Sequence, residues 1–342
     1  MTSSPARRSR SSGRITLHDV ARAAGVSPIT VSRALRGERS VGHALVARVK
    51  DAAAQLGYVP DPAARALASS RSTHVAVLLP MLSNQLFVEL FEAAHRTFGP
   101  AGYQTLIGVT HYDPHEEEQL LRDQLMHRPA GLLVTGFDRR DETRQLIAAS
   151  GVPVVHVMET SPAAGVYSVG FSQRRAGHAL THHLLQRGRR RIAFAAAQLD
   201  PRTLQRADGY RACMREAGLY DAALEWLRPE PSSLALGGEM FAQLMQRKQP
   251  PDAIFFCNDD LAQGALLAAL QLGIKVPSQV AVAGFNDLPG SEQMLPRLTS
   301  VRTPRVEIGK QAARMLLRLM RGEHVETPCL DLGYELMLRD ST

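Results

Sequence analysis

The sequence lacks the features that mark secreted, membrane-spanning and disulfide-bonded proteins. Its three cysteines, Cys213, Cys257 and Cys329, are odd in number and widely spaced. This pattern fits neither a disulfide framework nor a zinc site and indicates a reducing compartment. No stretch reaches the roughly 18 apolar residues of a membrane span, and the N-terminal segment has no apolar signal core. We therefore expect a cytoplasmic protein with no membrane partner.

The sequence also lacks the short motifs of common catalytic sites. It contains no G-x-x-x-x-G-K-[ST] phosphate loop, no H-E-x-x-H, no G-x-S-x-G, and no G-x-G-x-x-G after an expected strand. His182 and His183 lack metal-ligand spacing and are expected on a polar helix face. We predict no cofactor, no metal and no catalytic residue. An enzyme stays open only as the alternative class, because α/β folds host many reactions.

Positive charge is present, but it is gathered at one end of the chain. Residues 1–73 hold 12 Arg or Lys against 4 Asp or Glu, whereas the remainder holds 28 against 29. A basic segment on a near-neutral body is typical of a nucleic-acid binder. Residues 1–13 are expected to form a disordered basic arm, either adding weak phosphate contacts or having no function.

Residues 16–35, TLHDVARAAGVSPITVSRAL, have the pattern of two short helices joined by a tight turn. Thr16 and Asp19 have capping-box spacing, and Gly25 permits the turn. Ser27 and Pro28 suit the cap and first position of the second helix. The residues expected to face inward are Val20, Ala21, Ala23, Ala24, Val31 and Leu35. This layout predicts a helix-turn-helix, with an ordinary helical hairpin as the alternative.

A third helix is expected over residues 44–56, which completes a DNA-binding headpiece at 14–58. Residues 59–73 are expected to form a hinge helix and linker. The segment DPAARALASSRS begins with a capping Asp and a Pro, but it is too short for a stable isolated helix. It is therefore read as a segment that folds on DNA, and a plain linker stays open.

From residue 74 onward, apolar strands alternate with amphipathic helices. This alternation predicts parallel sheets covered on both faces, arranged as two doubly wound α/β subdomains in residues 74–342. The expected N-subdomain comprises about 74–171 and 302–325. The expected C-subdomain comprises about 172–301 and 326–342. Ligands bind at the carboxyl ends of strands in such folds, so the expected site is the cleft between the subdomains.

These motifs together resemble the lac repressor family of bacterial transcription regulators over nearly the whole chain. The matching pieces include LHDVARAAGVSPITVSRAL, LGYVPDPAARALAS, FCNDDLAQGALLAALQLGIKVP and VAVAGFND. Within the family, LLPMLSNQLFVEL, GYQTLI, LDPRT and CLDLGYEL are most similar to the gluconate-operon repressors. The resemblance implies a headpiece, a hinge helix and a core of the periplasmic-binding-protein type. It also implies a homodimer on a pseudopalindromic double-stranded DNA operator.

The resemblance assigns DNA contacts to the second helix and to the hinge. The residues aligned with base-reading positions are Pro28, Ile29, Thr30 and Arg33. Arg33 is suited to guanine O6 and N7, and Ile29 to a thymine methyl group or else to helix packing. The residues expected to contact phosphate are Thr16, Ser27, Ser32 and Arg36. In the hinge, Leu67 aligns with the wedge that kinks the minor groove, with Ala64 and Ala68 along its floor.

For the effector, the resemblance points to Arg206, which aligns with an arginine that grips the ligand in sugar-binding relatives. Arg202 lies one helical turn earlier. Two guanidinium groups suit a carboxylate or a diol, although salt bridges to neighbouring acids are the alternative. The other expected cleft residues are Asn84, Phe87, Ser172, Asn258, Asp259 and Asn286. Core packing is the alternative for Phe87, and helix capping is the alternative for Asp259.

Two departures from the family bear on the ligand. Many relatives have an aspartate where this chain has Asn286, and another where it has Ser172. Fewer cleft carboxylates favour an anionic ligand. We therefore expect a nucleoid-associated repressor controlled by a sugar acid, with gluconate first and 2-ketogluconate, a phosphorylated sugar or a neutral sugar as alternatives. Whether the ligand releases DNA or acts as a corepressor stays open. A periplasmic sugar-binding protein would lack the headpiece.

Overall fold

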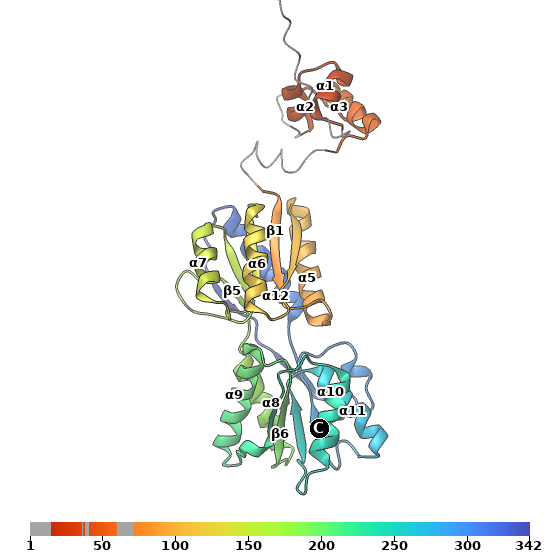
Figure 1. Cartoon of the computed structure of the whole chain (residues 1–342), viewed down its shortest axis with the longest axis vertical. Helices are drawn as coiled ribbons and strands as arrows, with labels where there is room; N and C mark the ends of the chain where they lie inside the picture. Colours follow the sequence, from red (N-terminus) through yellow and green to blue (C-terminus); the bar gives the residue numbers. More distant parts are fainter. Residues whose placement is uncertain (1–14, 36, 38–40, 60–71) are drawn as a thin grey trace, which may run out of the picture. The chain divides into compact units, whose positions relative to one another are not determined.

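The computed structural model describes residues 15–35, 37, 41–59 and 72–342. The chain divides into two compact units, residues 1–71 and residues 72–342, and each unit is treated by itself. The first contains short helices, and the second contains sheets flanked by helices (Figure 1).

The first unit contains helices α1 (Leu17–Ala24), α2 (Pro28–Leu35) and α3 (His43–Leu56). The predicted capping box is confirmed, because the Asp19 carboxylate accepts from the Thr16 N–H at 2.9 Å while the Thr16 hydroxyl accepts from the Asp19 N–H at 3.4 Å. The left-handed Gly25 (φ 65°) ends α1. The helix-turn-helix pattern therefore folds as its local signals predict.

The headpiece core is small and built from one side of each helix. Val20, Val31 and Val49 are fully buried and come from α1, α2 and α3 respectively. One expectation on this core needs correction, because Ala23 is exposed. Leu35 is partly buried and packs against the core as expected, and Ala34 is buried beside it. Both lie on the face of Val31, since residues three and four positions apart share one side of a helix.

The second unit begins with a six-stranded parallel sheet in the order β11-β5-β4-β3-β1-β2. Its strands are β1 (His74–Leu79), β2 (Gln104–Val109), β3 (Gly131–Thr135), β4 (Val154–Met158), β5 (Ser168–Gly170) and β11 (Cys329–Asp331). Its helices are α5 (Gln85–Phe98), η1 (Gly99–Ala101), α6 (Pro114–Met126), α7 (Asp141–Ser150) and α12 (Arg305–Met320). Successive side chains of β1 point to opposite faces of the sheet and enter different core clusters. Val75, Val77 and Leu79 join one core cluster, and Ala76 and Leu78 join the other.

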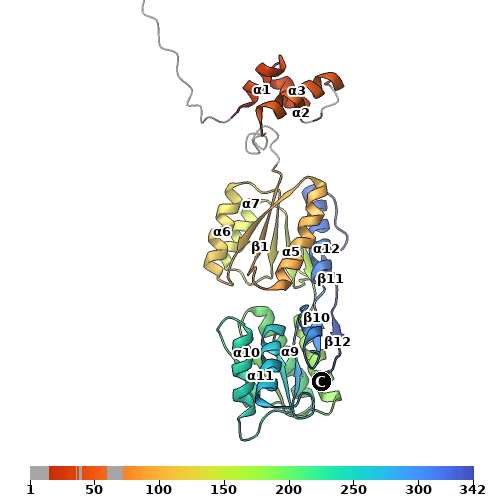
Figure 2. The same cartoon turned by 90° about the vertical axis from the view of Figure 1, so that its right-hand side faces the viewer.

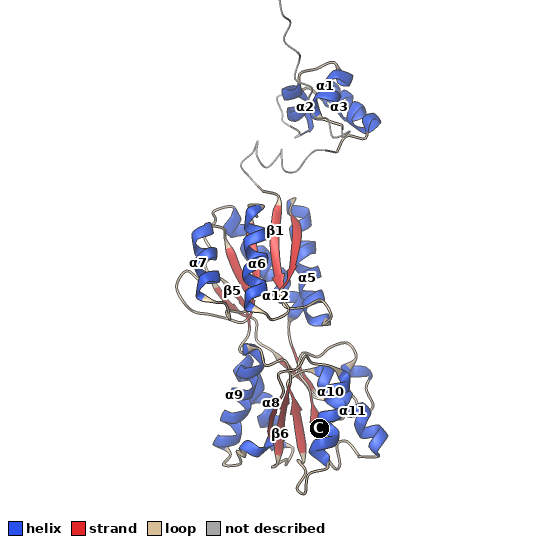
Figure 3. Ribbon diagram, viewed as in Figure 1, coloured by secondary structure: helices blue, strands red, loops and turns tan. Residues whose placement is uncertain are grey.

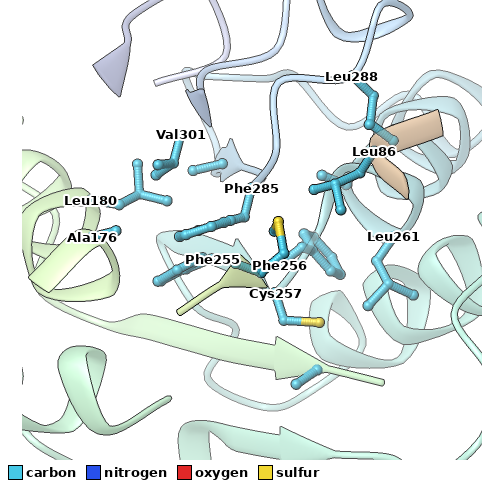
Figure 4. Packing of buried hydrophobic residues seen from close by; sticks show 14 of the residues in the cluster. Leu86, Ala176, Leu180, Phe255, Phe256, Cys257, Leu261, Phe285, Leu288 and Val301 are labelled. Atoms are coloured by element: carbon cyan, nitrogen blue, oxygen red, sulfur yellow. The ribbon is translucent and has the colours of Figure 1, made fainter. Parts of the chain in front are cut away.

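The second subdomain has a four-stranded parallel sheet in the order β7-β6-β8-β9. Its strands are β6 (Ile192–Ala196), β7 (Glu225–Leu227), β8 (Ala253–Phe256) and β9 (Ala281–Ala283). Its helices are α8 (Gln173–Gln186), α9 (Pro201–Glu216), η2 (Ala222–Leu224), α10 (Leu234–Met245), α11 (Asp259–Leu272) and η3 (Ser291–Gln293). Figure 4 shows part of its core, where Phe255 and Phe285 stack at 6.5 Å between ring centroids. Helices on both faces of both sheets confirm the predicted α/β class (Figure 3).

The chain passes between the subdomains after β5, after β10 (Ser300–Arg302) and after β11, and it returns to β12 (Glu335–Met337) beside β10 (Figure 2). The expected boundary is wrong at one point. Residues 326–342 were assigned to the C-subdomain, but β11 pairs in parallel with β5 and so extends the N-terminal sheet. Only the last part of the tail, from β12 onward, belongs with the C-terminal subdomain.

Helices α10 and α11 lie in close contact because glycines face backbone. A Cβ on Gly264 would overlap the carbonyl oxygen of Leu234, and a Cβ on Gly237 would overlap that of Leu261. Both glycines lie inside helices, where their conformational freedom is a disadvantage. The short distance between the two helix backbones therefore explains why glycine stands at these positions.

We predict that Gly264→Ala lowers the free energy of unfolding by about 1–3 kcal/mol, as overpacking does. An alanine in a helix ordinarily stabilises by about 1 kcal/mol over glycine. A fall in the free energy of unfolding would therefore show that the close approach outweighs helix propensity. Gly99→Ala is the matched control, because nothing lies within 4 Å of its Cβ position. Urea unfolding of the full chain measures both variants. Equal stability of the two would contradict the close approach.

Candidate DNA-binding surface and ligand cleft

The second headpiece helix presents an exposed face opposite its buried residues. Ile29 is 64% exposed, and Arg33, four residues later on the same side, is also exposed. Ile29 therefore does not pack inside the headpiece. Thr30 and Ser32 are partly exposed at the edges of this face, and Pro28 begins the helix. The helix thus offers an apolar side chain and a guanidinium group side by side, as base-edge contacts require.

The two hydroxyls expected to contact phosphate are both engaged at helix starts. Ser27 Oγ accepts from the Thr30 N–H at 3.2 Å and lies 2.8 Å from Thr30 Oγ1. The Thr16 hydroxyl donates to Asp19 Oδ2 at 2.7 Å. Helix N-termini with exposed backbone N–H groups are suited to phosphate. The other predicted DNA contacts, Arg36, Ala64, Leu67 and Ala68, lie outside the described residues.

In the second unit, backbone strain is concentrated where strands end. The described non-glycine residues with positive φ include His111 and Tyr112 after β2, Met158 at the end of β4, Gln198 after β6, and Asn286 and Asp287 after β9. Such conformations cost on the order of 1–3 kcal/mol each and gather at functional sites. The carboxyl ends of the strands are also where doubly wound folds bind ligands. Strain and topology therefore indicate the same region.

Arg202, at the start of α9, is held in a cluster of carboxylates. Its Nη1 lies 3.3 Å from Asp138 Oδ1 and 3.1 Å from Glu159 Oε1, and its Nε lies 3.0 Å from Asp200 Oδ1. Asp138 and Glu159 follow β3 and β4 in the N-terminal subdomain, so these ion pairs join the two subdomains. Burial opposes the charge of Arg202, but the carboxylates outweigh it and raise its pKa above its usual value. Arg202 therefore forms salt bridges to neighbouring acids, which was the alternative to ligand binding.

Arg206, one turn later on α9, has a different environment. Its Nε donates to Gln173 Oε1 at 2.9 Å, and its Nη1 donates to the Cys257 carbonyl at 2.6 Å. The guanidinium carbon lies 3.9 Å from the ring centroid of Phe285. Among the described residues no carboxylate lies within ion-pair distance of it, and burial lowers its pKa. Arg206 is thus a buried cation held by neutral acceptors and an aromatic face.

Three predicted cleft residues cap the helices that follow strand ends. Asn84 Oδ1 accepts from the Leu86 N–H at 2.9 Å, and Ser172 Oγ accepts from the Arg175 N–H at 3.2 Å. Asn258 Oδ1 accepts from the Leu261 N–H at 3.1 Å, so Asn258 is the cap of α11. Asn84 also donates to Asp260 Oδ2 at 3.2 Å, which is a second polar contact between the subdomains.

The remaining predicted cleft residues are enclosed by protein. Asp259 is fully buried and accepts from the Leu288 N–H and from the hydroxyls of Ser291 and Ser300. Burial raises its pKa to about 6. Asp259 therefore anchors the segment after β9 and does not cap α11. Phe87 packs in the core, and Asn286 Oδ1 accepts from the Thr303 hydroxyl at 3.3 Å.

Sequence reasoning missed several residues that the fold brings to the cleft. Tyr112 lies under Arg202, with 5.7 Å from the guanidinium carbon to the ring centroid. Gly136 leaves room for the cluster, since a Cβ there would overlap Arg202, Asp138 and Glu159.

The expectation of a cleft with few carboxylates also needs correction. Substitution at Asn286 and Ser172 does not leave the cleft poor in carboxylates, because three surround Arg202. The sequence signal for these acids is their position, since Asp138, Glu159 and Asp200 each follow a strand of a parallel sheet.

The described residues contain neither a metal-binding cluster nor a helix that could span a membrane. No group of three or more His, Cys, Asp or Glu side chains there is arranged to hold a metal ion. In the same part of the chain, no helix combines the length and the apolar character that crossing a membrane requires.

Comparison with known proteins connects both units to one family. Residues 16–61 match the model of bacterial regulatory proteins of the lacI family, and residues 181–342 match a periplasmic binding protein-like domain. The HTH-type transcriptional regulator GntR of Pseudomonas aeruginosa is 56% identical over 333 residues, which is 97% of each chain. The crystal structure of transcription regulator GntR from Chromobacterium violaceum is 47% identical, with a TM-score of 0.77, over 78% of this chain and 98% of that one.

A lacI-family regulator from Silicibacter pomeroyi, known by crystal structure, is 35% identical, with a TM-score of 0.89, over 96% of this chain and 99% of that one. These relatives are transcriptional regulators and not enzymes. The chain therefore belongs to the lacI family of bacterial regulatory proteins and is a DNA-binding transcriptional regulator.

Proposed function

We propose that the protein is a homodimeric repressor, acting on DNA in the cytoplasm, whose hold on a pseudopalindromic operator is controlled by a small sugar acid. Gluconate is the first candidate, and genes of gluconate uptake or catabolism are the proposed targets. The observation that carries the ligand class is Arg206, a buried guanidinium at the strand ends without a carboxylate partner among the described residues. A guanidinium fork matches a ligand carboxylate in geometry and charge. The resemblance to gluconate-operon repressors supports the same choice.

In this proposal the ligand acts by preferring one arrangement of the two subdomains. A sugar acid at Arg206 meets Asn258 and Asn84 at neighbouring strand ends, where amide groups suit sugar hydroxyls. A hundredfold preference for the state that does not bind DNA is worth about 2.7 kcal/mol, enough to release an operator. Ile29 and Arg33 read bases in the proposed complex, and the wedge role of Leu67 stays a prediction from the sequence.

Calorimetric titration of the full chain tests the ligand class. We expect gluconate or a close sugar acid to bind, and ribose and galactose not to bind, because only an acid forms an ion pair with the guanidinium of Arg206. The series includes 2-ketogluconate and 6-phosphogluconate. Binding of a neutral sugar alone would leave the regulator intact and refute the sugar-acid proposal.

Arg206→Lys is expected to weaken gluconate binding by about 10- to 100-fold while operator binding is unchanged. The lysine keeps the charge but loses the two-pronged geometry, and a hydrogen bond to a charged group is worth about 1.5–3 kcal/mol. Arg215→Lys, on the exposed face of the same helix, is the matched control. A wild-type gluconate affinity in Arg206→Lys would remove Arg206 from the site.

Arg33→Ala is expected to relax base preference at one position of each half-site. The free energy by which guanine is preferred over other bases there should fall by about 1–3 kcal/mol. Selection from random duplexes first defines the operator, and binding to single-base variants then measures the preference. Ser32→Ala is the control on the same helix. If Arg33→Ala instead weakens binding equally on all sequences, Arg33 is a phosphate contact.

A further inference from the structure

The carboxylate of Glu159 is held by helix α9 much as a ligand's acid group would be. Its Oε1 lies 3.1 Å from Arg202 Nη1, and its Oε2 accepts from Gln205 Nε2 at 2.8 Å. Both donors belong to the C-terminal subdomain, whereas Glu159 follows β4 of the N-terminal one. The side chain is 10% exposed, so this is an enclosed contact. Glu159 therefore links the subdomains with both of its oxygens.

The same helix also carries the arginine proposed to bind the ligand. Arg206 follows Gln205 directly and lies one turn from Arg202. The Arg202 cluster already holds three carboxylates for one guanidinium, since Asp138 and Asp200 join Glu159. Opposite charges attract and like charges repel most strongly where water is excluded. An acid group arriving at Arg206 thus meets an excess of negative charge one turn away.

We propose that Glu159 is a built-in competitor of the acidic ligand and the residue that couples ligand binding to the arrangement of the subdomains. In the ligand-free core, Glu159 occupies the donors at the start of α9 and ties the N-terminal subdomain to that helix. Binding of a sugar acid at Arg206 requires release of Glu159, which frees this edge of the cleft. The inference rests on the proposed function, because it takes the ligand to be an acid bound at Arg206.

The Arg202 cluster is closely packed on the side of β3. Gly136 has no room for a Cβ beside Arg202, Asp138 and Glu159. The three side chains are therefore closely packed against the end of β3. Displacement of Glu159 removes a negative charge from the neighbourhood of Arg206 and also breaks a contact between the subdomains. Asn84 and Asp260 remain as a contact elsewhere in the cleft, so the subdomains loosen at one edge only.

Glu159→Gln in the full-length protein tests the proposal, since it keeps the shape and removes the charge. Gluconate affinity measured by calorimetry is expected to rise about tenfold, as expected for loss of a nearby like charge. Glu225→Gln is the matched control. Glu225 also has a 10% exposed side chain paired with an arginine, but its partner Arg211 lies in the same subdomain. Unchanged or weaker gluconate binding in Glu159→Gln would overturn the proposal.

A second measurement needs no ligand. Amide hydrogen exchange of the ligand-free protein is expected to quicken around residues 137–139 and 159–161 in Glu159→Gln but not in Glu225→Gln. Should the wild type bind no sugar acid, quickened exchange would still support the inter-subdomain tie, and the ligand class alone would fail. Exchange like that of the wild type would refute the tie. Asp138→Asn, with a 33% exposed side chain, repeats both measurements on the same guanidinium if Glu159→Gln does not fold.

Discussion

The ion pairs of Arg202 with Asp138 and Glu159 are the contact on which the proposed control of the core depends. Both sheets are parallel, so the polar residues that follow their strands gather at the carboxyl edges. Arg202 joins those edges across the subdomain boundary. A buried ion pair adds little net stability, because desolvation offsets its Coulomb energy. In the proposed mechanism, release of Glu159 breaks one of these pairs while Asp138 and Asp200 still compensate the charge of Arg202.

Two arginines on one helix face thus have opposite environments. Arg202 is surrounded by acids and stays charged, whereas Arg206 is held by an amide oxygen, a carbonyl and an aromatic ring. Neutral acceptors satisfy the hydrogen-bonding groups of Arg206 but not its charge. In the proposed function, a ligand carboxylate compensates the charge of Arg206, whereas at Arg202 three carboxylates already do so. The two residues are both arginines, so the roles proposed for them differ only because their neighbours differ.

Most of the fold could be predicted from the sequence, because its signals are local. The capping box at Thr16, the turn at Gly25 and the alternation of strands and helices from residue 74 onward agree with the structure. Strands β5, β7, β10 and β12 have three residues each, which are too few to show a period in the sequence. Strand β11 was assigned to the wrong subdomain, since its partner β5 lies far away along the chain. Pairing between distant strands has no local signature.

The site was harder to predict for the same physical reason. Arg206 could be named from the resemblance, but the partners of Arg202 lie 43 and 64 residues away in the sequence. No spacing rule connects residues at such separations, and only the meeting of two sheets does so. Counting the carboxylates lost at Asn286 and Ser172 therefore gave an incomplete picture of cleft charge. The acids that matter for an anionic ligand are those the fold delivers to α9. In the proposed mechanism, their effect on the ligand depends on whether Glu159 is bound to α9 or released from it.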